Sequence, residues 1–162
     1  MILGDSRILE RVEKQKLIEN FSKECLESTG YDLRVNRAYM LGSDSFIGVK
    51  ERKTPEVVEI ESNTFELNPG DYILVETLEK VNMPSDVMAR ILPRSSLFRC
   101  GCILATAVVD PGYTGTLTIG LKNASDKVFK LERNARVAQI VFEEVIDSVK
   151  NYNGKYQGGK VV

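Results

Sequence analysis

The 162-residue chain is long enough for one domain with a buried core and too short for two comfortable ones. Hydrophobic residues make up 43% of it and charged residues 28%, the balance of an ordinary globular protein. A formal net charge of −1 excludes a global basic field of the kind that binds nucleic acid, so any affinity for anions must be local.

The residue types exclude further classes of protein. The absence of histidine removes His-based catalytic triads and the zinc sites that use histidine. Cys25, Cys100 and Cys102 have no framework spacing, which predicts a reduced, cytoplasmic setting. No apolar run approaches the roughly 18 residues that span a bilayer, and the charged N-terminus is unlike a signal peptide. We therefore expect no membrane partner and no nucleic-acid partner.

One short helix is predicted near the N-terminus. Asp5 or Ser6 can cap it, and it would run to about Lys16 with Ile8 and Val12 on one face.

From residue 31 onward, short segments rich in Val, Ile, Tyr and Thr alternate with turn signals. The expected strands are 31–35, 45–50, 56–61, 72–81, 86–92, 107–110, 116–122, 127–131 and 136–145. Many short strands separated by turns favour an all-β sandwich or barrel. The Gly-rich and polar segment 151–162 is predicted to be a mobile tail.

The stretch "LPRSSLFRCG" interrupts a strand with polar residues. Pro93 ends the ladder because it has no N–H to donate. Arg94, Ser95 and Ser96 then offer a guanidinium group, two hydroxyls and free backbone N–H groups, which suit phosphate oxygens, and Arg99 adds a second cation. A surface turn with solvated arginines would explain the same residues.

The stretch "VVDPGYTGTLTIGL" predicts a β-hairpin with Asp110 at its turn. The Asp110 carboxylate could take a proton from a water, and Tyr113 offers a flat face for a sugar or base. Asp is also a common turn residue for reasons of local hydrogen bonding alone.

Three further features have both a structural and a functional interpretation. Asp32 could be a buried structural carboxylate, paired with Arg34 or with backbone N–H groups, or a catalytic one. Gln139 lies in an otherwise apolar strand, where its amide needs a partner unless the strand is at an edge. Cys100 and Cys102 are interpreted as small core residues because no second cysteine pair accompanies them.

Four of these stretches, in this order, resemble the motifs of the dUTPase and dCTP deaminase superfamily: "GYDLR", "PRSSL", "VVDPGYTG" and "RVAQI". The tail "GKYQGG" is similar to the family's closing segment, and the opening "MILGDSRI" resembles the deaminase branch. The resemblance implies a distorted antiparallel β-barrel of jelly-roll type with a short N-terminal helix. It also implies a homotrimer whose sites are each built from more than one subunit, and Mg²⁺ held through the nucleotide phosphates instead of by protein ligands.

The resemblance further implies a role for each matched residue. Asp110 corresponds to the carboxylate that activates water. Phosphate contacts are implied for Arg94, Ser95, Ser96, Arg99, Gln139 and Lys155. Nucleoside contacts are implied for Leu104, Ala105, Thr106, Ala107, Tyr113 and Tyr156, and supporting roles for Asp32 and Arg136. Residues 1–150 would form the barrel domain, and residues 151–162 the tail that closes over the active site.

The function that this resemblance first suggests is dUTP diphosphatase, which hydrolyses dUTP to dUMP and pyrophosphate with Mg²⁺. The alternatives are a dCTP deaminase, a bifunctional dCTP deaminase/dUTPase, or a nucleotide-binding regulator without turnover. In the deaminase branch, a Glu ten residues after the matched Asp activates the water that attacks the pyrimidine ring, and here that position is Gly120. Gly112 is a second departure, because the dUTPase motif usually has a second Asp or a similar polar residue there.

Overall fold

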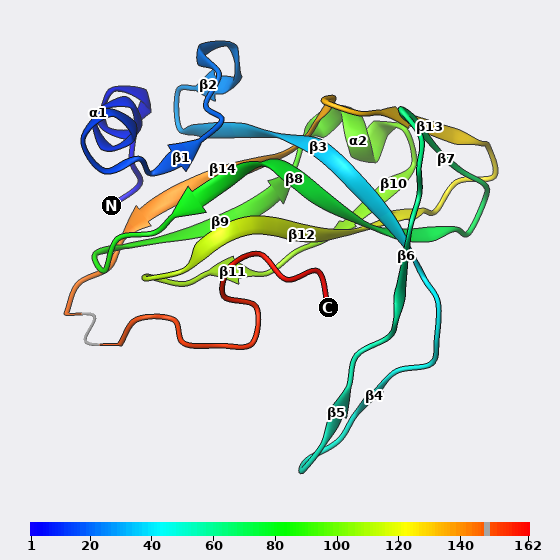
Figure 1. Ribbon diagram of the computed structural model, residues 1–162. Coiled ribbons are helices and arrows are strands. Elements are labelled where there is room, and N and C mark those ends of the chain that lie inside the picture. The colour runs from blue at the N-terminus through cyan, green and yellow to red at the C-terminus, as the bar shows by residue number, and fades with distance from the viewer. Residues whose placement is uncertain (148–149) are drawn as a thin grey trace.

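The computed structural model describes residues 1–147 and 150–162, and its strands curl around one core (Figure 1). The main sheet has the order β10-β12-β8-β3-β14-β9-β11. Its strands are β3 (Gly30–Leu41), β8 (Tyr72–Asn82), β9 (Val87–Pro93), β10 (Cys102–Ala105), β11 (Val108–Val109), β12 (Thr114–Asn123) and β14 (Arg136–Glu144). The expectation of an all-β, antiparallel, barrel-like fold with a short N-terminal helix is confirmed.

Smaller elements complete the fold. The helices are α1 (Asp5–Gln15), the 3-10 turn η1 (Lys23–Cys25) and α2 (Ser95–Arg99). The short strands are β1 (Ile18–Glu19), β2 (Leu26–Glu27), β4 (Phe46–Ile47), β5 (Arg52–Lys53), β6 (Val57–Glu59), β7 (Thr64–Leu67) and β13 (Phe129–Glu132). None of the described helices is long and apolar enough to cross a membrane.

Alternation of apolar residues places one face of each long strand in the core. In β9, Val87, Ala89 and Ile91 are buried, as the sequence pattern predicts. The core also holds Phe65 and Phe142, each fully buried. Burial of one such aromatic side chain contributes about 1.5–3 kcal/mol.

A buried carboxylate joins the N-terminal half of β3 to β8. Glu79 is fully buried, and its two oxygens accept hydrogen bonds from the backbone N–H of Arg34 (2.8 Å) and from Nε of Arg34 (2.7 Å). The Tyr31 hydroxyl also donates to it (3.2 Å). Arg34 is therefore the partner of Glu79, and not of Asp32, which was one of the alternatives that the sequence left open.

The predicted hairpin around Asp110 is wrong in its pairing. Val108 and Val109 pair with Arg90 and Ala89 of β9, whereas β12 pairs with β8 and β10. The turn therefore connects two strands that lie far apart in the sheet order. Turn residues show where the chain reverses, but they do not show which strands pair afterwards.

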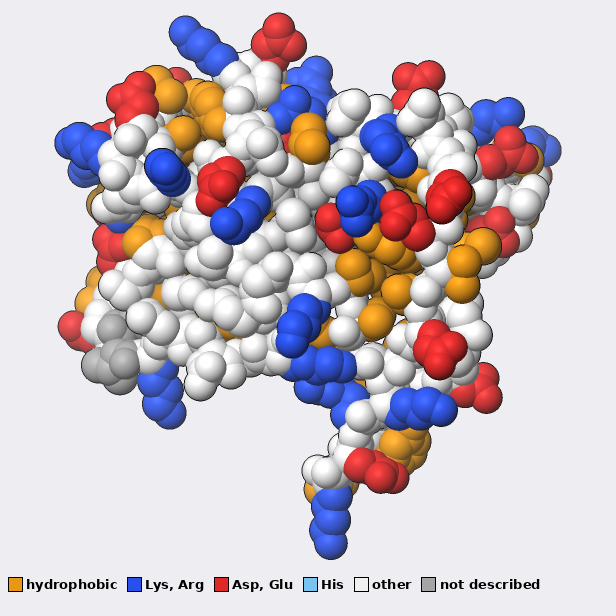
Figure 2. Space-filling view, viewed as in Figure 1, with side chains coloured by type: hydrophobic (Ala, Val, Ile, Leu, Met, Phe, Trp, Pro, Cys, Tyr) orange, Lys and Arg blue, Asp and Glu red, His pale blue; other side chains and the backbone are white. Residues whose placement is uncertain are grey.

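Two other local expectations change. Residues 45–50 form only the two-residue strand β4, which pairs with β5 in a ribbon that projects from the barrel (Figure 1). The polar interruption after Pro93 is a short helix, α2, where a turn was expected. Figure 2 shows hydrophobic side chains gathered where the ribbon leaves the barrel, with charged side chains around them.

Candidate active site

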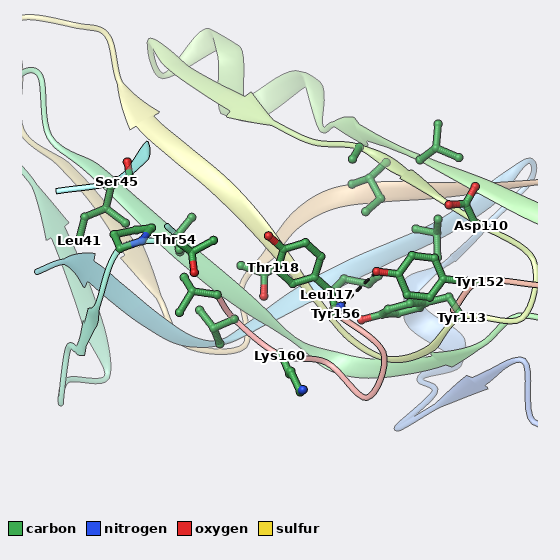
Figure 3. A pocket seen from close by; sticks show the side chains of 18 of the residues that line it. Leu41, Ser45, Thr54, Asp110, Tyr113, Leu117, Thr118, Tyr152, Tyr156 and Lys160 are labelled. Atoms are coloured by element: carbon green, nitrogen blue, oxygen red, sulfur yellow. Dashed lines mark hydrogen bonds between the residues drawn. The ribbon is translucent and has the colours of Figure 1, made fainter. Parts of the chain in front are cut away.

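Asp110 lies in the wall of a cavity of about 460 Å³ on the open face of the sheet. Four parts of the fold line it. Strands β8 and β12 contribute Tyr72, Leu74, Leu117 and Thr118, and the β9–β11 region with its turn contributes Ile91, Ala107, Val108, Val109, Asp110 and Tyr113. The tail contributes Tyr152, Tyr156, Lys160, Val161 and Val162, and the base of the ribbon contributes Leu41, Ser45, Thr54 and Pro55. Figure 3 shows Asp110 at one end beside the rings of Tyr113 and Tyr152, and Ser45 and Thr54 at the other.

The backbone of the turn fixes where Asp110 points. The Tyr113 N–H donates to the Asp110 carbonyl (3.2 Å), and the Gly112 N–H donates to the carbonyl of Met83 (3.0 Å). Gly112 has φ +80°, and a Cβ there would lie 2.5 Å from the Cβ of Asn151. Both the left-handed backbone and the packed tail require glycine at this position, which accounts for the absence of a second carboxylate.

Tyr113 is fixed beside Asp110 by its burial and by two contacts. Its side chain is buried, its hydroxyl donates to the carbonyl of Thr116, and its ring meets Tyr152 edge-on at 5.4 Å between centroids. Burial raises the pKa of Tyr113 to about 12, so the phenol stays protonated at neutral pH. Its ring therefore forms a rigid apolar wall of the cavity.

Of the residues expected to contact the pyrimidine base, some line the cavity and others do not. Ala107 lines the cavity, whereas Leu104 and Ala105 belong to β10. Thr106 connects the two parts, and its hydroxyl donates to the carbonyl of Ile91 (2.8 Å).

The tail lies against the start of β12. The Tyr152 N–H donates to the carbonyl of Pro111 (2.7 Å), and the Gly158 N–H to that of Thr114 (2.8 Å). Tyr156 lines the cavity, whereas Lys155 does not but donates a hydrogen bond to the hydroxyl of the lining residue Thr54 (2.8 Å). The mobility and closing motion of this tail stay predictions.

A second cluster holds the other predicted site residues. The buried Asp32 carboxylate forms an ion pair with Nε of Arg94 (2.9 Å) and accepts a hydrogen bond from Nη1 of Arg136 (3.4 Å). Burial raises the pKa of Asp32, and the Arg94 charge opposes that shift. Asp32 thus anchors Arg94 beside α2.

Strand register and α2 place the remaining members of this second cluster. Gln139 is paired with Asp32 across β14 and β3. Ser95, Ser96 and Arg99 lie on α2, next in the chain after Arg94.

The cavity residues around Asp110 and the second cluster around Arg94 lie at opposite ends of β9. Val109 pairs with Ala89, so Asp110 emerges near Met88, and Arg94 lies six positions further along the chain. At about 3.3 Å per residue this separation is about 20 Å. The structure therefore brings Asp110, Ala107, Tyr113 and Tyr156 together, but it does not bring them to the Arg94 group within one chain.

Gly120 of β12 faces a tyrosine. A Cβ at this position would lie 2.0 Å from the Tyr72 hydroxyl oxygen and 3.1 Å from the Cβ of Ala105. No side chain can extend from residue 120 while Tyr72 keeps this position.

Five residues in or near the cavity were not predicted from the sequence: Tyr72, Glu76, Thr118, Tyr152 and Lys160. Glu76 of β8 is half-buried, accepts a hydrogen bond from the Tyr39 hydroxyl (3.3 Å) and is the register partner of Thr118. Burial raises the pKa of Glu76 above its usual value, although Arg37 and Tyr39 partly oppose the shift. Its alternation with core residues was visible in the sequence, but its closeness to the cavity follows from the pairing of β8 with β12.

Within residues 1–147 and 150–162, no group of three or more Cys, Asp or Glu side chains is arranged to hold a metal ion.

Comparison with known proteins identifies the family of the chain. The dCTP deaminase-like family matches residues 2–145. A dCTP deaminase of Pyrococcus horikoshii is 42% identical over 149 residues, which covers 91% of this chain and 88% of that protein. A "dCTP deaminase, dUMP-forming" of Aquifex aeolicus is 35% identical over 167 residues, covering 100% of this chain and 92% of that protein. The 2'-deoxycytidine 5'-triphosphate deaminase structure from Agrobacterium tumefaciens has a TM-score of 0.70 at 20% identity, over 87% of this chain and 47% of that one.

These relatives overturn the first functional expectation. Plain dUTP diphosphatase was favoured because Gly120 stands where the deaminase branch has a Glu. The relatives at 35–42% identity are nevertheless named as deaminases. A single position was therefore given too much weight against similarity along the whole chain.

Proposed function

Because this chain belongs to the dCTP deaminase-like family, we propose that it deaminates dCTP to dUTP with release of ammonia. The observation that carries the proposal is the family match over residues 2–145, together with the 42% identity to a relative named dCTP deaminase. The cavity beside Asp110 supports it, because rigid aromatic walls and the backbone at Ala107 suit a flat pyrimidine ring.

Deamination needs a group that moves protons at ring position 4. Water adds to that carbon, the amine departs as ammonia, and a carbonyl remains. A carboxylate can take the proton from water and give it to the leaving nitrogen. Gly120 offers no such group, so we assign this role to Glu76.

Three observations support Glu76. It faces the same side of β8 as Tyr72 and Leu74, which line the cavity. It stands opposite Thr118, another lining residue, and such directly paired residues have Cβ atoms about 5 Å apart. Its raised pKa favours reversible protonation closer to neutral pH than an exposed Glu would show.

A second candidate function is the dUMP-forming variant of the same reaction. It is favoured by Asp110, a carboxylate in the cavity wall beside the buried ring of Tyr113. Asp110 would activate a second water for attack on the α-phosphorus, with pyrophosphate as the leaving group. Mg²⁺ bound to the triphosphate would neutralise charge on the leaving group, as that ion commonly does on nucleotides.

The proposal takes the phosphate-binding residues from a second copy of the chain. The separation of about 20 Å along β9 supports this, since Arg94 and Asp110 are too far apart to contact neighbouring atoms. A homotrimer with shared sites is the arrangement that the family resemblance implies. Mixing the Ser95→Ala variant with Asp110→Asn should then restore part of the dUMP-forming activity that each lacks alone. Mixtures that stay as inactive as their components would contradict a shared site.

The proposed reaction is tested by incubating the purified protein with dCTP and with dUTP separately, in the presence of Mg²⁺. Ammonia and pyrophosphate are assayed in each. Ammonia from dCTP without pyrophosphate supports deamination alone, and equimolar release of both supports the dUMP-forming variant. No ammonia from dCTP would overturn the proposal.

A further inference from the structure

Tyr72 occupies the space where a side chain at residue 120 would otherwise extend. Its direct register partner on β12 is Lys122, and Gly120 is two residues from that partner on the same face. Such a diagonal neighbour lies within reach of an aromatic side chain. The hydroxyl oxygen stands 2.0 Å from the ideal Cβ position of Gly120, so the Tyr72 ring lies directly over bare backbone.

The Tyr72 hydroxyl is available to a ligand. Tyr72 lines the cavity, and 39% of the residue is exposed. Among the described residues, none makes a hydrogen bond to this hydroxyl, in contrast to the neighbouring Tyr39 and Tyr113, whose hydroxyls both have partners. A phenol within a cavity wall usually finds a partner, and here the cavity side is where a partner can come from.

The surroundings define what that partner would be. Ala105, which the family resemblance places at the pyrimidine edge, lies beside Gly120 in the register of β10 and β12. Glu76, assigned above to proton transfer at ring position 4, projects from the same face of β8 as Tyr72. The Tyr72 hydroxyl is therefore on the side of the cavity where the exocyclic group of the ring would stand.

We propose that Tyr72 is a pyrimidine-binding residue whose hydroxyl forms a hydrogen bond with the substituent at position 4 of the ring; this rests on the function proposed above. A phenol hydroxyl can both accept and donate a hydrogen bond. It accepts from the amine of cytosine and donates to the carbonyl of uracil. One residue thereby fits the substrate and the product, which a fixed donor or a fixed acceptor would not.

A purely structural role for Tyr72 makes a different prediction. Glycine inside a strand is unfavourable relative to alanine, and an aromatic ring that covers it compensates. That role needs the ring but not the hydroxyl. The Tyr72→Phe variant separates the two, because it keeps the ring and removes only the oxygen.

The test measures equilibrium binding of three triphosphates to wild type and to Tyr72→Phe by calorimetry. The ligands are dCTP, dUTP and the analogue with hydrogen at ring position 4, and both proteins also carry Glu76→Gln and Asp110→Asn to suppress turnover, so that they differ only at residue 72. We expect the variant to lose about 3- to 10-fold in affinity for dCTP and dUTP and nothing for the analogue. Wild type should itself bind the analogue more weakly than dCTP, a comparison that needs no variant.

The outcomes distinguish this inference from the function on which it rests. If wild type binds none of the three, the proposed function and the inference both fall. If wild type binds dCTP and dUTP but Tyr72→Phe binds all three like wild type, the inference alone is overturned. Thermal melting of Tyr72→Phe within about 1 °C of wild type shows that the retained ring still covers Gly120.

Discussion

Replacement of Arg94 by alanine tests how the second cluster is held together. The Arg94→Ala change removes the closer of the two cations on Asp32, whose side chain is only 3% exposed. Loss of one partner of a buried ion pair typically costs 3–5 kcal/mol. The Arg94 side chain is 30% exposed, and Arg136 still contacts Asp32 at 3.4 Å. Solvent screening and the remaining cation reduce the expected loss to about 2 kcal/mol at neutral pH.

The same change has a pH dependence of defined sign. Burial already raises the pKa of Asp32, and removal of Arg94 takes away the largest effect that lowers it. The ionised Asp32 carboxylate is therefore disfavoured in the folded variant. The loss of unfolding free energy relative to wild type is present above the folded-state pKa of Asp32 and shrinks as the pH falls through that pKa. Protonation relieves the unpaired charge.

Urea unfolding of wild type and Arg94→Ala at pH 7.5 and at pH 4 measures this effect. The matched control is Asp32→Asn/Arg94→Ala, which has no carboxylate at position 32. Its loss of unfolding free energy should be smaller and the same at both pH values. A penalty for Arg94→Ala that is equal at both pH values, or that Asp32→Asn does not relieve, would refute the ion-pair reasoning.

The remaining predictions concern turnover. Asp110→Asn should retain nucleotide binding and lose about 10²–10⁴-fold in pyrophosphate release, because an amide cannot accept a proton; unchanged release would exclude Asp110 as the base. Glu76→Gln should lower ammonia release by a comparable factor. Because burial raises the pKa of Glu76, the ionised side chain lowers the unfolding free energy of wild type above that pKa. Glu76→Gln lacks this ionisation, so its unfolding free energy relative to that of wild type should rise between pH 4 and pH 7. Removal of residues from Asn151 onward should impair turnover more than it lowers the melting temperature. A truncated protein that loses its cooperative melting transition while its remaining folded fraction stays active would contradict this.

The sequence predicted those features that depend on local chemistry. The period-two pattern in β9 identified its buried face, and "VVDPGYTG" located a turn with Asp110 at its start. Composition and turn spacing were sufficient for the fold class, since short alternating segments leave few other architectures.

Features that depend on long-range pairing were not predictable in the same way. Arg34 pairs with Glu79, which is 45 residues away, and no local pattern distinguishes that partner from the nearby Asp32. The contact between Tyr72 and Gly120 likewise exists only because β8 and β12 are neighbours. The glycine was noticed in the sequence, but the side chain that requires it was not.

The most direct test of the proposed function is the fate of the exocyclic nitrogen of dCTP. With dCTP labelled by ¹⁵N at the 4-amino group, NMR should show the label leaving as ammonium at the rate at which the cytosine signals disappear. Glu76→Gln should slow this conversion without preventing dCTP binding. A label that stays on the pyrimidine while wild type consumes dUTP would contradict the account.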